Sequence, residues 1–335
     1  MIVFGIMGSP RPKGNTDRLL SAFLEGAREA GAQVLTISVG DKRIAPCQGC
    51  RYCEHHGHCR LADDDMDEIY GLLRRADMIV AATPIFFYGP SAQIKALIDR
   101  SQTLWARRYV YKLVEPKTSF RKGFLLAVGA TKGGQLFDGT VLTARYFFDA
   151  VSARFEGYLG FRQMEGPTDI ELHPTALAET REKARLLTTG LTGRRRVLFV
   201  CRENACRSQM AEAFLQLHGG QHFDAESIGD QPAAAINPLV VEVMAEKHID
   251  VAYRRPKGAQ EILEDPPFAA VIQMGCEMRC PAIPAAAVYD WGLPDPAGQP
   301  IEFMRELRDS IEERVNAFIE EQEGVRSEDH VKTTG

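Results

Sequence analysis

The sequence predicts an α/β protein with two doubly wound parallel-sheet domains that follow one another along the chain. Two observations support this fold class. Short continuous apolar runs, typical of strands that are covered on both faces, alternate with amphipathic stretches of helical length. The 335 residues also exceed the length of one typical domain, and they suffice for two domains that each have a core.

The first domain is predicted from four apolar runs and from helical patterns near its start and end. The runs expected to be strands are 1–7, 32–39, 76–83 and 122–130. A helix is expected over 15–31, and another over 172–190, which stops at Gly190. The polar stretch LTGRRR comes next, so we predict a first domain of residues 1–190 and a linker of residues 191–195.

The second domain, predicted to span residues 196–322, repeats the same alternation on a smaller scale. Its expected strands are 197–200, 223–229 and 267–275. Its expected helices are 208–219, 237–248 and 301–321. The last residues, 323–335, show no hydrophobic periodicity, and we expect a disordered tail there.

The composition is that of an ordinary soluble globular protein. Apolar residues make up 45% and charged residues 25%, and the net charge of -5 gives no reason to expect a nucleic acid partner. The chain starts with MIVFGIMG, without a basic leader, and contains no apolar run long enough to span a membrane. We therefore expect a cytoplasmic protein that has no membrane partner.

The eight cysteines are grouped rather than dispersed. One group lies at positions 47, 50, 53 and 59, a second at 201 and 206, and a third at 276 and 280. In a reducing compartment, such groups indicate metal binding and thiol chemistry instead of a disulfide framework.

The loop GSPRPKGNT, residues 8–16, connects the first expected strand to the first expected helix. Backbone N–H groups at such a helix N-terminus bind anions, and flavodoxin-like sheets hold the FMN phosphate there. The candidate phosphate ligands are Ser9, Arg11, Asn15 and Thr16. Glycine and serine are also common in strand-to-helix turns that bind no ligand.

Two further loops follow expected strands and support a flavin site. The first could flank an isoalloxazine ring with Pro84, Ile85, Phe86, Phe87, Tyr88 and Gly89. The second is VGATKGG at 128–134, and its candidates are Ala130, Lys132 and Gly133. Together with the loop 8–16, these segments predict FMN as a cofactor.

Four cysteines in the first domain form the pattern C-x2-C-x2-C-x5-C; they are Cys47, Cys50, Cys53 and Cys59. Three thiolates at this spacing are too close for a pair of separated zinc knuckles, and they suit a cuboidal cluster whose iron atoms lie close together. We predict a 4Fe-4S cluster. The alternatives are a loop without metal, or zinc bound with help from His55, His56 or His58.

Residues 1–190 resemble the iron–sulfur flavoprotein branch of the NAD(P)H-dependent FMN reductases. The resemblance rests on GSPRPKGNT, on the cysteine motif with DDMDEIY after it, and on TPIFFYGPSAQIKALIDR. It implies a flavodoxin-like fold, FMN, a cluster placed for electron exchange with the flavin, and a homo-oligomer with FMN near a subunit interface. It leaves open whether NADH, NADPH or ferredoxin donates the electrons.

The stretch VLFVCRENACRSQMAEAF places Cys201 directly after an expected strand and Arg207 after five intervening residues. A C-x5-R loop of this kind wraps backbone N–H groups and a guanidinium around a tetrahedral oxyanion, with the cysteine sulfur beneath the central atom. The same donors favour the thiolate and make Cys201 a nucleophile, and Ser208 can hydrogen-bond the sulfur. Asp295, in DWGLPDPAG, is the expected general acid.

Residues 195–322 resemble the low-molecular-weight tyrosine phosphatase family, and more closely its arsenate reductase branch. Besides the C-x5-R loop, ESIGDQPAAAINPLVVEVM, YRRPKG, IQMGCEMRCP and DWGLPDPAG carry this resemblance. Arg202 and Glu203 replace the small or apolar residues often seen after a phosphatase nucleophile, and SIGD departs from the more usual Ser-Ala-Gly-Thr at Ser227.

Cys276 and Cys280 favour the reductase reading, because a phosphatase needs only water to hydrolyse its intermediate. The resemblance implies that Cys201 attacks arsenate, that Cys276 then attacks the Cys201 sulfur and expels arsenite, and that Cys280 resolves this disulfide. Cys206 is expected to take no part. A buried thiol pair beside a proline turn is the structural alternative for Cys276 and Cys280.

The sequence thus predicts a fusion of an FMN and iron–sulfur electron-transfer domain with a thiol-dependent arsenate reductase. Its expected partners are arsenate or a phosphate-like oxyanion, a second copy of the chain, and thioredoxin or ferredoxin. The two alternatives are a protein tyrosine phosphatase attached to a redox flavoprotein, and a non-catalytic oxyanion sensor. The thiols Cys276 and Cys280 argue against the first, and Asp295 beside an intact nucleophile loop argues against the second.

Overall fold

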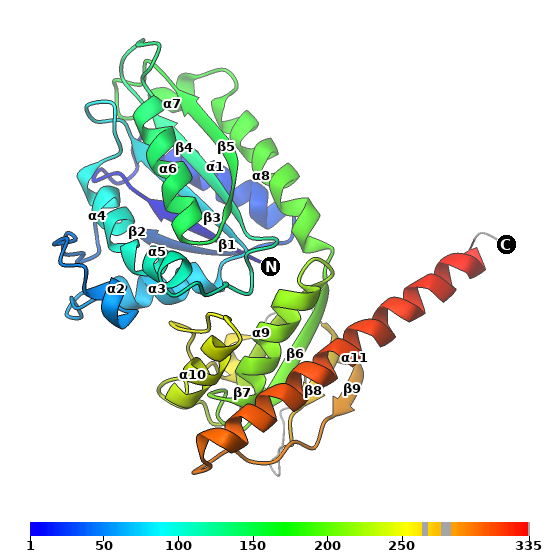
Figure 1. Cartoon of the computed structure of the whole chain (residues 1–335). Helices are drawn as coiled ribbons and strands as arrows, with labels where there is room; N and C mark the ends of the chain where they lie inside the picture. Colours follow the sequence, from blue (N-terminus) through cyan, green and yellow to red (C-terminus); the bar gives the residue numbers. More distant parts are fainter. Residues whose placement is uncertain (263–266, 276–282, 334–335) are drawn as a thin grey trace. The chain divides into compact units, whose positions relative to one another are not determined.

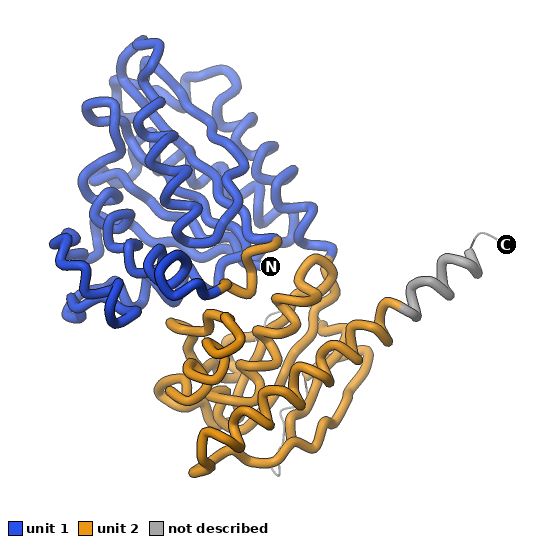
Figure 2. Tube along the Cα trace, viewed as in Figure 1, with its two compact units in different colours: residues 1–113, 120–193 blue, residues 114–119, 194–335 orange. Residues whose placement is uncertain are grey.

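The computed structural model describes residues 1–262, 267–275 and 283–333. The chain divides into two compact units (Figure 2). Unit 1 comprises Met1–Leu113 and Phe120–Gly193, and unit 2 comprises Val114–Ser119 and Arg194–Gly335. No helix of the described residues is both long enough and apolar enough to cross a membrane.

Unit 1 is built on a five-stranded parallel sheet with the order β2-β1-β3-β4-β5. Its strands are β1 (Ile2–Met7), β2 (Gln33–Ser38), β3 (Met78–Pro84), β4 (Lys122–Val128) and β5 (Arg154–Phe161). This is the strand order of flavodoxin, and it confirms the doubly wound fold class. The central strands β1, β3 and β4 are almost entirely buried, which explains their continuous apolar sequences.

Helices cover both faces of this sheet (Figure 1). They are α1 (Asn15–Glu29), α2 (Tyr52–His56), α3 (Met66–Arg75), α4 (Ala92–Arg100), α5 (Gln102–Tyr109), α6 (Asp138–Ala150), α7 (Asp169–Leu172) and α8 (Ala176–Thr192). The helices α1 and α8 share one core with the sheet, in which Phe23 stacks on Phe124 at 5.5 Å between ring centroids. Because neighbouring strands are parallel, the loops that follow β1, β3 and β4 all lie at one edge of the sheet.

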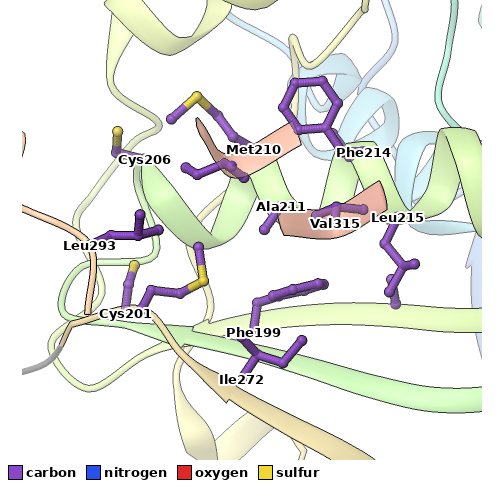
Figure 3. Packing of buried hydrophobic residues seen from close by; sticks show 14 of the residues in the cluster. Phe199, Cys201, Cys206, Met210, Ala211, Phe214, Leu215, Ile272, Leu293 and Val315 are labelled. Atoms are coloured by element: carbon purple, nitrogen blue, oxygen red, sulfur yellow. The ribbon is translucent and has the colours of Figure 1, made fainter. Parts of the chain in front are cut away.

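Unit 2 has a four-stranded parallel sheet with the order β7-β6-β8-β9. Its strands are β6 (Arg195–Cys201), β7 (Phe223–Gly229), β8 (Phe268–Gln273) and β9 (Ala285–Asp290), and its helices are α9 (Arg207–Gly219), α10 (Pro238–Glu246), the 3-10 helix η1 (Ala259–Glu261) and α11 (Ile301–Thr333). The main core lies between this sheet and α9, α10 and α11 (Figure 3). Phe199, Phe214 and Ile311 are fully buried in it.

The unit boundaries show three features that the sequence pattern did not indicate. Helix α8 extends to Thr192 and β6 starts at Arg195, so only two residues separate them. Helix α11 continues to Thr333, into the stretch 323–335 for which we expected no regular structure. Residues 114–119, grouped with the first domain in the sequence, belong to unit 2, where Val114 pairs with Ile249.

Candidate functional site

The loop between β6 and α9 forms a site around the sulfur of Cys201. Cys201 is the last residue of β6 and is only 2% exposed. The backbone N–H of Asn204 donates to Cys201 Sγ at 3.2 Å, and Ser208 Oγ lies 3.0 Å from the same sulfur. When the sulfur is ionised, the Ser208 hydroxyl is the donor, so the sulfur then accepts two hydrogen bonds.

The side chain of Asn204 holds this loop in place. Its Nδ2 donates to Ser208 Oγ at 2.9 Å and to Ser227 Oγ at 2.8 Å. Its Oδ1 accepts from the backbone N–H of Lys257 at 2.7 Å and from Gln209 Nε2 at 3.0 Å. Asn204 is fully buried and has φ 50°, a left-handed conformation that asparagine tolerates better than most residues. No sequence pattern singles out Asn204, although it lies inside the stretch CRENACRS.

A partly buried acid, Glu212, continues this network behind the loop. Ser227 Oγ donates to Glu212 Oε2 at 2.5 Å, and Arg254 Nη1 lies 3.4 Å from Glu212 Oε1. Burial alone would raise the pKa of Glu212, but the positive charges of Arg254 and Lys257, and then the hydrogen bond from Ser227, lower it below its ordinary value. Glu212 is therefore an ionised acceptor, and Ser227 has a defined place between it and Asn204.

Arg207 connects the loop to two other segments of unit 2. Its Nη1 donates to the carbonyl oxygens of Met274 and Leu293, both at 3.0 Å. Its Nη2 lies 3.7 Å from Asp295 Oδ1, and the side chain of Asp295 is 59% exposed while that of Arg207 is 5% exposed. The structure thus brings together Cys201, Ser208, Arg207 and Asp295, with the carboxyl open to solvent.

Unit 2 contains three more cysteines, at positions 206, 276 and 280. Cys206 lies at the same end of the core as Cys201 and Leu293 (Figure 3). Burial, and then the neighbouring Cys201, raise the pKa of Cys206 well above its ordinary value, so this thiol stays protonated. Cys276 and Cys280 lie outside the described residues.

The residue before Cys276 is anchored at the site. The carbonyl oxygen of Gly275 accepts from Arg207 Nη1 at 3.3 Å. Gly275 has φ 80°, and a Cβ atom there would lie 2.3 Å from the carbonyl oxygen of Leu293, so only glycine fits. The chain that leads to Cys276 therefore starts next to the guanidinium of Arg207.

In unit 1, the loop after β1 is compact and partly tied down by its own side chains. Ser9 Oγ accepts from the backbone N–H of Arg11 at 3.1 Å. Asn15 Nδ2 donates to the carbonyl oxygen of Gly166 at 2.7 Å, and its Oδ1 accepts from the N–H of Ile170 at 3.0 Å. Ser9, Asn15 and Thr16 are buried, whereas Arg11 is exposed. The amide of Asn15 thus already has partners within the chain.

The loop after β3 is strained and exposes aromatic rings. The backbone groups of Phe86 and Gly89 exchange two hydrogen bonds, at 2.9 and 3.0 Å, which closes a tight turn. Phe87 and Tyr88, between them, have φ 50° and 62°, and both side chains are exposed. Two successive non-glycine residues at positive φ carry strain of the kind that clusters at ligand sites.

Further contacts join the three loops at this edge of the sheet. Ser91 Oγ donates to the carbonyl oxygen of Gly8, and the N–H of Ile85 donates to the carbonyl oxygen of Val128 at 2.8 Å. A Cβ atom at Gly133 would lie 2.8 Å from Tyr88 Oη, so the second and third loops touch there. Ala130 and Lys132 of the third loop, like Phe86, are exposed, while Pro84 and Ile85 are half-buried. The candidate flavin residues therefore lie on three connected loops.

The four cysteines of unit 1 line one cavity of about 350 Å³, together with residues from the junction of α4 and α5. Cys47 and Cys50 are exposed, and Cys53 and Cys59 are partly buried. Burial first, and then the charges of Cys59 and Cys47, raise the pKa of Cys53, which shows that these thiols are neighbours. Four thiols around a cavity match the ligand set of a cubane cluster.

The histidines of the alternative zinc site contact their own surroundings. The ring of His56 stacks on Tyr52 at 3.9 Å between centroids, and His58 Nδ1 lies 2.9 Å from the carbonyl oxygen of His56. In the described part of the chain, no three His, Cys, Asp or Glu side chains are close enough to hold one metal ion.

Two family models match the chain. Residues 1–151 match NADPH-dependent FMN reductase, and residues 196–329 match low molecular weight phosphotyrosine protein phosphatase.

Similar proteins are known for each part. An iron–sulfur flavoprotein of Methanocaldococcus jannaschii is 41% identical over 134 residues, which are 40% of this chain and 65% of that protein. The chain thus spans slightly less than two thirds of the length of this relative. A putative arsenate reductase of Halobacterium salinarum is 37% identical over 129 residues, which are 37% of this chain and 89% of that protein. The solved structure of an arsenate reductase in the phosphate binding state is 32% identical and covers 38% of this chain and 98% of its own, with a TM-score of 0.36.

Proposed function

Because the chain joins a domain of the NADPH-dependent FMN reductase family to a domain of the low molecular weight phosphotyrosine protein phosphatase family, we propose that it is an oxidoreductase that reduces arsenate to arsenite. The observation that carries this proposal is the Cys201 sulfur, which accepts from Asn204 N–H and lies 3.0 Å from Ser208 Oγ at the N-terminus of α9. Arsenate reductases of 31 to 37% identity match this part of the chain over most of their own lengths.

In the first step, the Cys201 thiolate forms a bond to arsenic. One arsenate oxygen takes up protons and leaves as water, and Asp295, which is exposed and 3.7 Å from Arg207, supplies one of these protons. The N–H groups at the start of α9 and the Arg207 guanidinium bind the remaining oxygens. The product of this step is a Cys201–arsenate adduct that still contains As(V).

The next two steps are proposed for Cys276 and Cys280. The Cys276 thiolate attacks Cys201 Sγ, the sulfur–arsenic bond breaks, and its electron pair stays on arsenic, which leaves as arsenite. Cys280 then attacks Cys276 Sγ and expels the Cys201 thiolate, so the two electrons come from the thiols that end in a Cys276–Cys280 disulfide. The anchoring of Gly275 by Arg207 supports this order, because it starts the Cys276 segment beside the nucleophile loop.

Phosphate monoester hydrolysis is the second candidate activity. The same loop can bind a phosphoryl group, and Asp295 near Arg207 can protonate a leaving oxygen. This activity would need neither Cys276 nor Cys280, so the two functions predict different effects of the same mutations.

We further propose that unit 1 binds FMN and a 4Fe-4S cluster. Unit 1 would then supply electrons to the Cys276–Cys280 disulfide, directly or through thioredoxin. The strained Phe87 and Tyr88 turn and the loops after β1 and β4 would hold the flavin, and the four cysteines would hold the cluster. When bound, FMN converts two-electron donation by NAD(P)H into the one-electron steps that a cluster accepts. A homo-oligomer through unit 1 and a ferredoxin donor belong to the same proposal.

The test is arsenite formation by the full chain purified without oxygen. We expect multiple turnovers with arsenate and a reductant, and loss of all turnover in Cys201→Ser. If the protein hydrolysed an aryl phosphate but formed no arsenite with any of NADPH, reduced ferredoxin or thioredoxin, the reductase proposal would be wrong and the phosphatase reading would replace it.

A further inference from the structure

The wall of the cysteine cavity that carries no thiol is formed at the junction of two helices. Arg100 is the last residue of α4, and Thr103 lies in the first turn of α5. Both line the cavity with Cys47, Cys53 and Cys59, yet each is only 1% exposed. Two buried polar side chains therefore face the space that the thiols surround.

The guanidinium of Arg100 has five N–H donors, and four of them have a partner. Its Nη1 donates to the carbonyl oxygen of Ala45 at 2.9 Å and to Asp64 Oδ2. Its Nη2 donates to the carbonyl oxygen of Leu61 at 2.8 Å and to Asp64 Oδ1 at 3.3 Å. These bonds fix the plane of the guanidinium, because Asp64 and two backbone carbonyls hold it along one side.

The fifth donor of Arg100, Nε–H, is buried and has no partner among the described residues, and the same is true of Thr103 Oγ1. Buried polar groups nearly always have hydrogen-bond partners in folded proteins. Two such atoms at one cavity indicate that a bound group with acceptor atoms completes the site. The buried guanidinium of Arg100 at this cavity favours an acceptor that is negative or polarisable.

The charge of Arg100 supports the same assignment. Burial lowers the pKa of Arg100, but the hydrogen bond with Asp64 and the charges of its neighbours, which include Cys59, raise it overall. The guanidinium is therefore cationic and close to a thiolate of the proposed ligand set.

We propose that Arg100 Nε–H and the Thr103 hydroxyl donate hydrogen bonds to sulfur atoms of the cluster that the four cysteines hold, and that they raise its reduction potential. Hydrogen bonds and positive charge near the sulfurs stabilise the more negative, reduced cluster. This inference rests on the proposed 4Fe-4S cluster and assigns two hydrogen-bond donors to its sulfur atoms.

The test compares midpoint potentials of the cluster in the full chain and in two variants of Thr103. Thr103→Val removes the hydroxyl and keeps the shape of the side chain, whereas Thr103→Ser keeps the hydroxyl. One hydrogen bond to a charged acceptor is equivalent to about a tenfold change in the ratio of reduced to oxidised cluster, or about 59 mV for a one-electron couple. We expect the Val variant to shift negative by about this amount and the Ser variant to stay near the parent value.

The matched control is Thr180→Val. Thr180 Oγ1 is also buried without a partner among the described residues, but Thr180 lies in α8 and does not line the cysteine cavity. We expect this variant to leave the midpoint potential unchanged. Electron paramagnetic resonance of the reduced protein during a potentiometric titration reads only loaded chains, so a partial loss of cluster does not affect the result.

Arg100→Lys provides a second measurement, since lysine keeps the charge and lacks Nε–H in this position. We expect a negative shift here as well. Unchanged potentials in both Thr103→Val and Arg100→Lys would overturn the inference while the cluster assignment stands. Stoichiometric zinc without sulfide in the parent protein would instead overturn the cluster, and the inference with it.

Discussion

The side-chain amide of Asn204 donates to Ser208 Oγ at 2.9 Å, while its own backbone N–H donates to the Cys201 sulfur at 3.2 Å. One residue therefore positions the hydroxyl and supplies a donor at the nucleophile. Its conformation, with φ 50°, is maintained by bonds to segments far away in sequence, such as Ser227 and Lys257. The surroundings of the thiol thus depend on β7 and on the chain around Lys257, as well as on the loop itself.

We predict that Asn204→Ala slows arsenite formation by about 10- to 100-fold, which corresponds to the loss of one or two hydrogen bonds that support a charged sulfur. The measurement is the initial rate of arsenite release with saturating reductant. Asn237→Ala is the control, because it removes only the side-chain cap of α10 at Leu239 N–H and keeps the backbone hydrogen bond from Asn237 N–H to the carbonyl oxygen of Ala205 in the loop. Equal losses in both variants would indicate a general loss of stability instead of a local effect.

The sequence was sufficient to place Cys201, Arg207 and Ser208 together, because their spacing lies between the end of a strand and the start of a helix. It was insufficient for Asn204 and Glu212, whose partners lie in β7 and in the 254–257 segment and are brought near only by the fold. The strain at Phe87 and Tyr88 was also not predictable, since neither residue type favours positive φ. Residues 114–119 belong to unit 2 through the pairing of Val114 with Ile249, a residue far away in the sequence. A pattern of neighbouring residues does not contain such a long-range pairing.

The thiol relay predicts separate effects for its members. Cys201→Ser should abolish arsenite release, whereas Cys276→Ser should still allow attack on arsenate but stop before a multiple-turnover cycle, since no thiol then accepts the Cys201 sulfur. Hydrolysis of a small aryl phosphate should survive in Cys276→Ser and Cys280→Ser, because it needs only the loop and Asp295. Arsenate reduction at the parent rate in both of these variants would show that the relay is wrong.

Glu212 should make the loop sensitive to acid. Its folded pKa lies below the ordinary value of 4.5, so its stabilising contribution is complete above about pH 4.5 and is lost as the pH falls through the folded pKa. We expect amide hydrogen exchange of residues 204–229, corrected for the intrinsic rate, to accelerate over this range in the parent. Glu212→Gln should exchange faster already at pH 6 and show a flatter profile.

The control for this experiment is Glu313→Gln, because Glu313 is an exposed residue of α11. We expect its exchange profile over residues 204–229 to follow the parent at every pH. A parent profile that stays level down to pH 3 would mean that the ionised Glu212 does not hold the loop.

Tyr88→Gly should separate strain from flavin binding. Glycine adopts φ 62° without steric cost, so we expect the flavin-free protein to be stabilised by up to about 1 kcal/mol. Loss of the exposed ring should weaken FMN binding by about tenfold, as expected for one aromatic contact. Thermal unfolding and fluorescence titration with FMN measure the two effects.

Lys112→Gly is the matched control for Tyr88→Gly. Lys112 has φ 55° and lies after α5, outside the three loops. We expect the Lys112→Gly variant to gain a similar free energy of unfolding and to bind FMN with the affinity of the parent. If Tyr88→Gly bound FMN as tightly as this control does, the loop after β3 would not be the ring site.

The last prediction concerns electron transfer from unit 1 to the Cys276–Cys280 disulfide within one assembly. Only Gly193 and Arg194 separate α8 from β6, so each redox unit experiences the other at an effective concentration of roughly millimolar order wherever the geometry lets them meet. Separating the halves at this joint would be a poor test, because it removes residues 114–119 from unit 2.

Complementation between full-length chains avoids this difficulty. Cys50→Ser should lack the cluster but keep the thiol relay, and Cys201→Ser should keep the cluster but lack the relay. Each is purified as a preformed assembly, and the two are then mixed with NADPH, without thioredoxin. Transfer within an assembly predicts that the parent rate is proportional to protein concentration, whereas the mixture is much slower and rises with the square of concentration. Transfer within the assembly would be excluded if the mixture were as fast as the parent at low concentration, or if the parent showed no turnover until thioredoxin was added. Neither result would contradict the proposed reaction of Cys201 with arsenate.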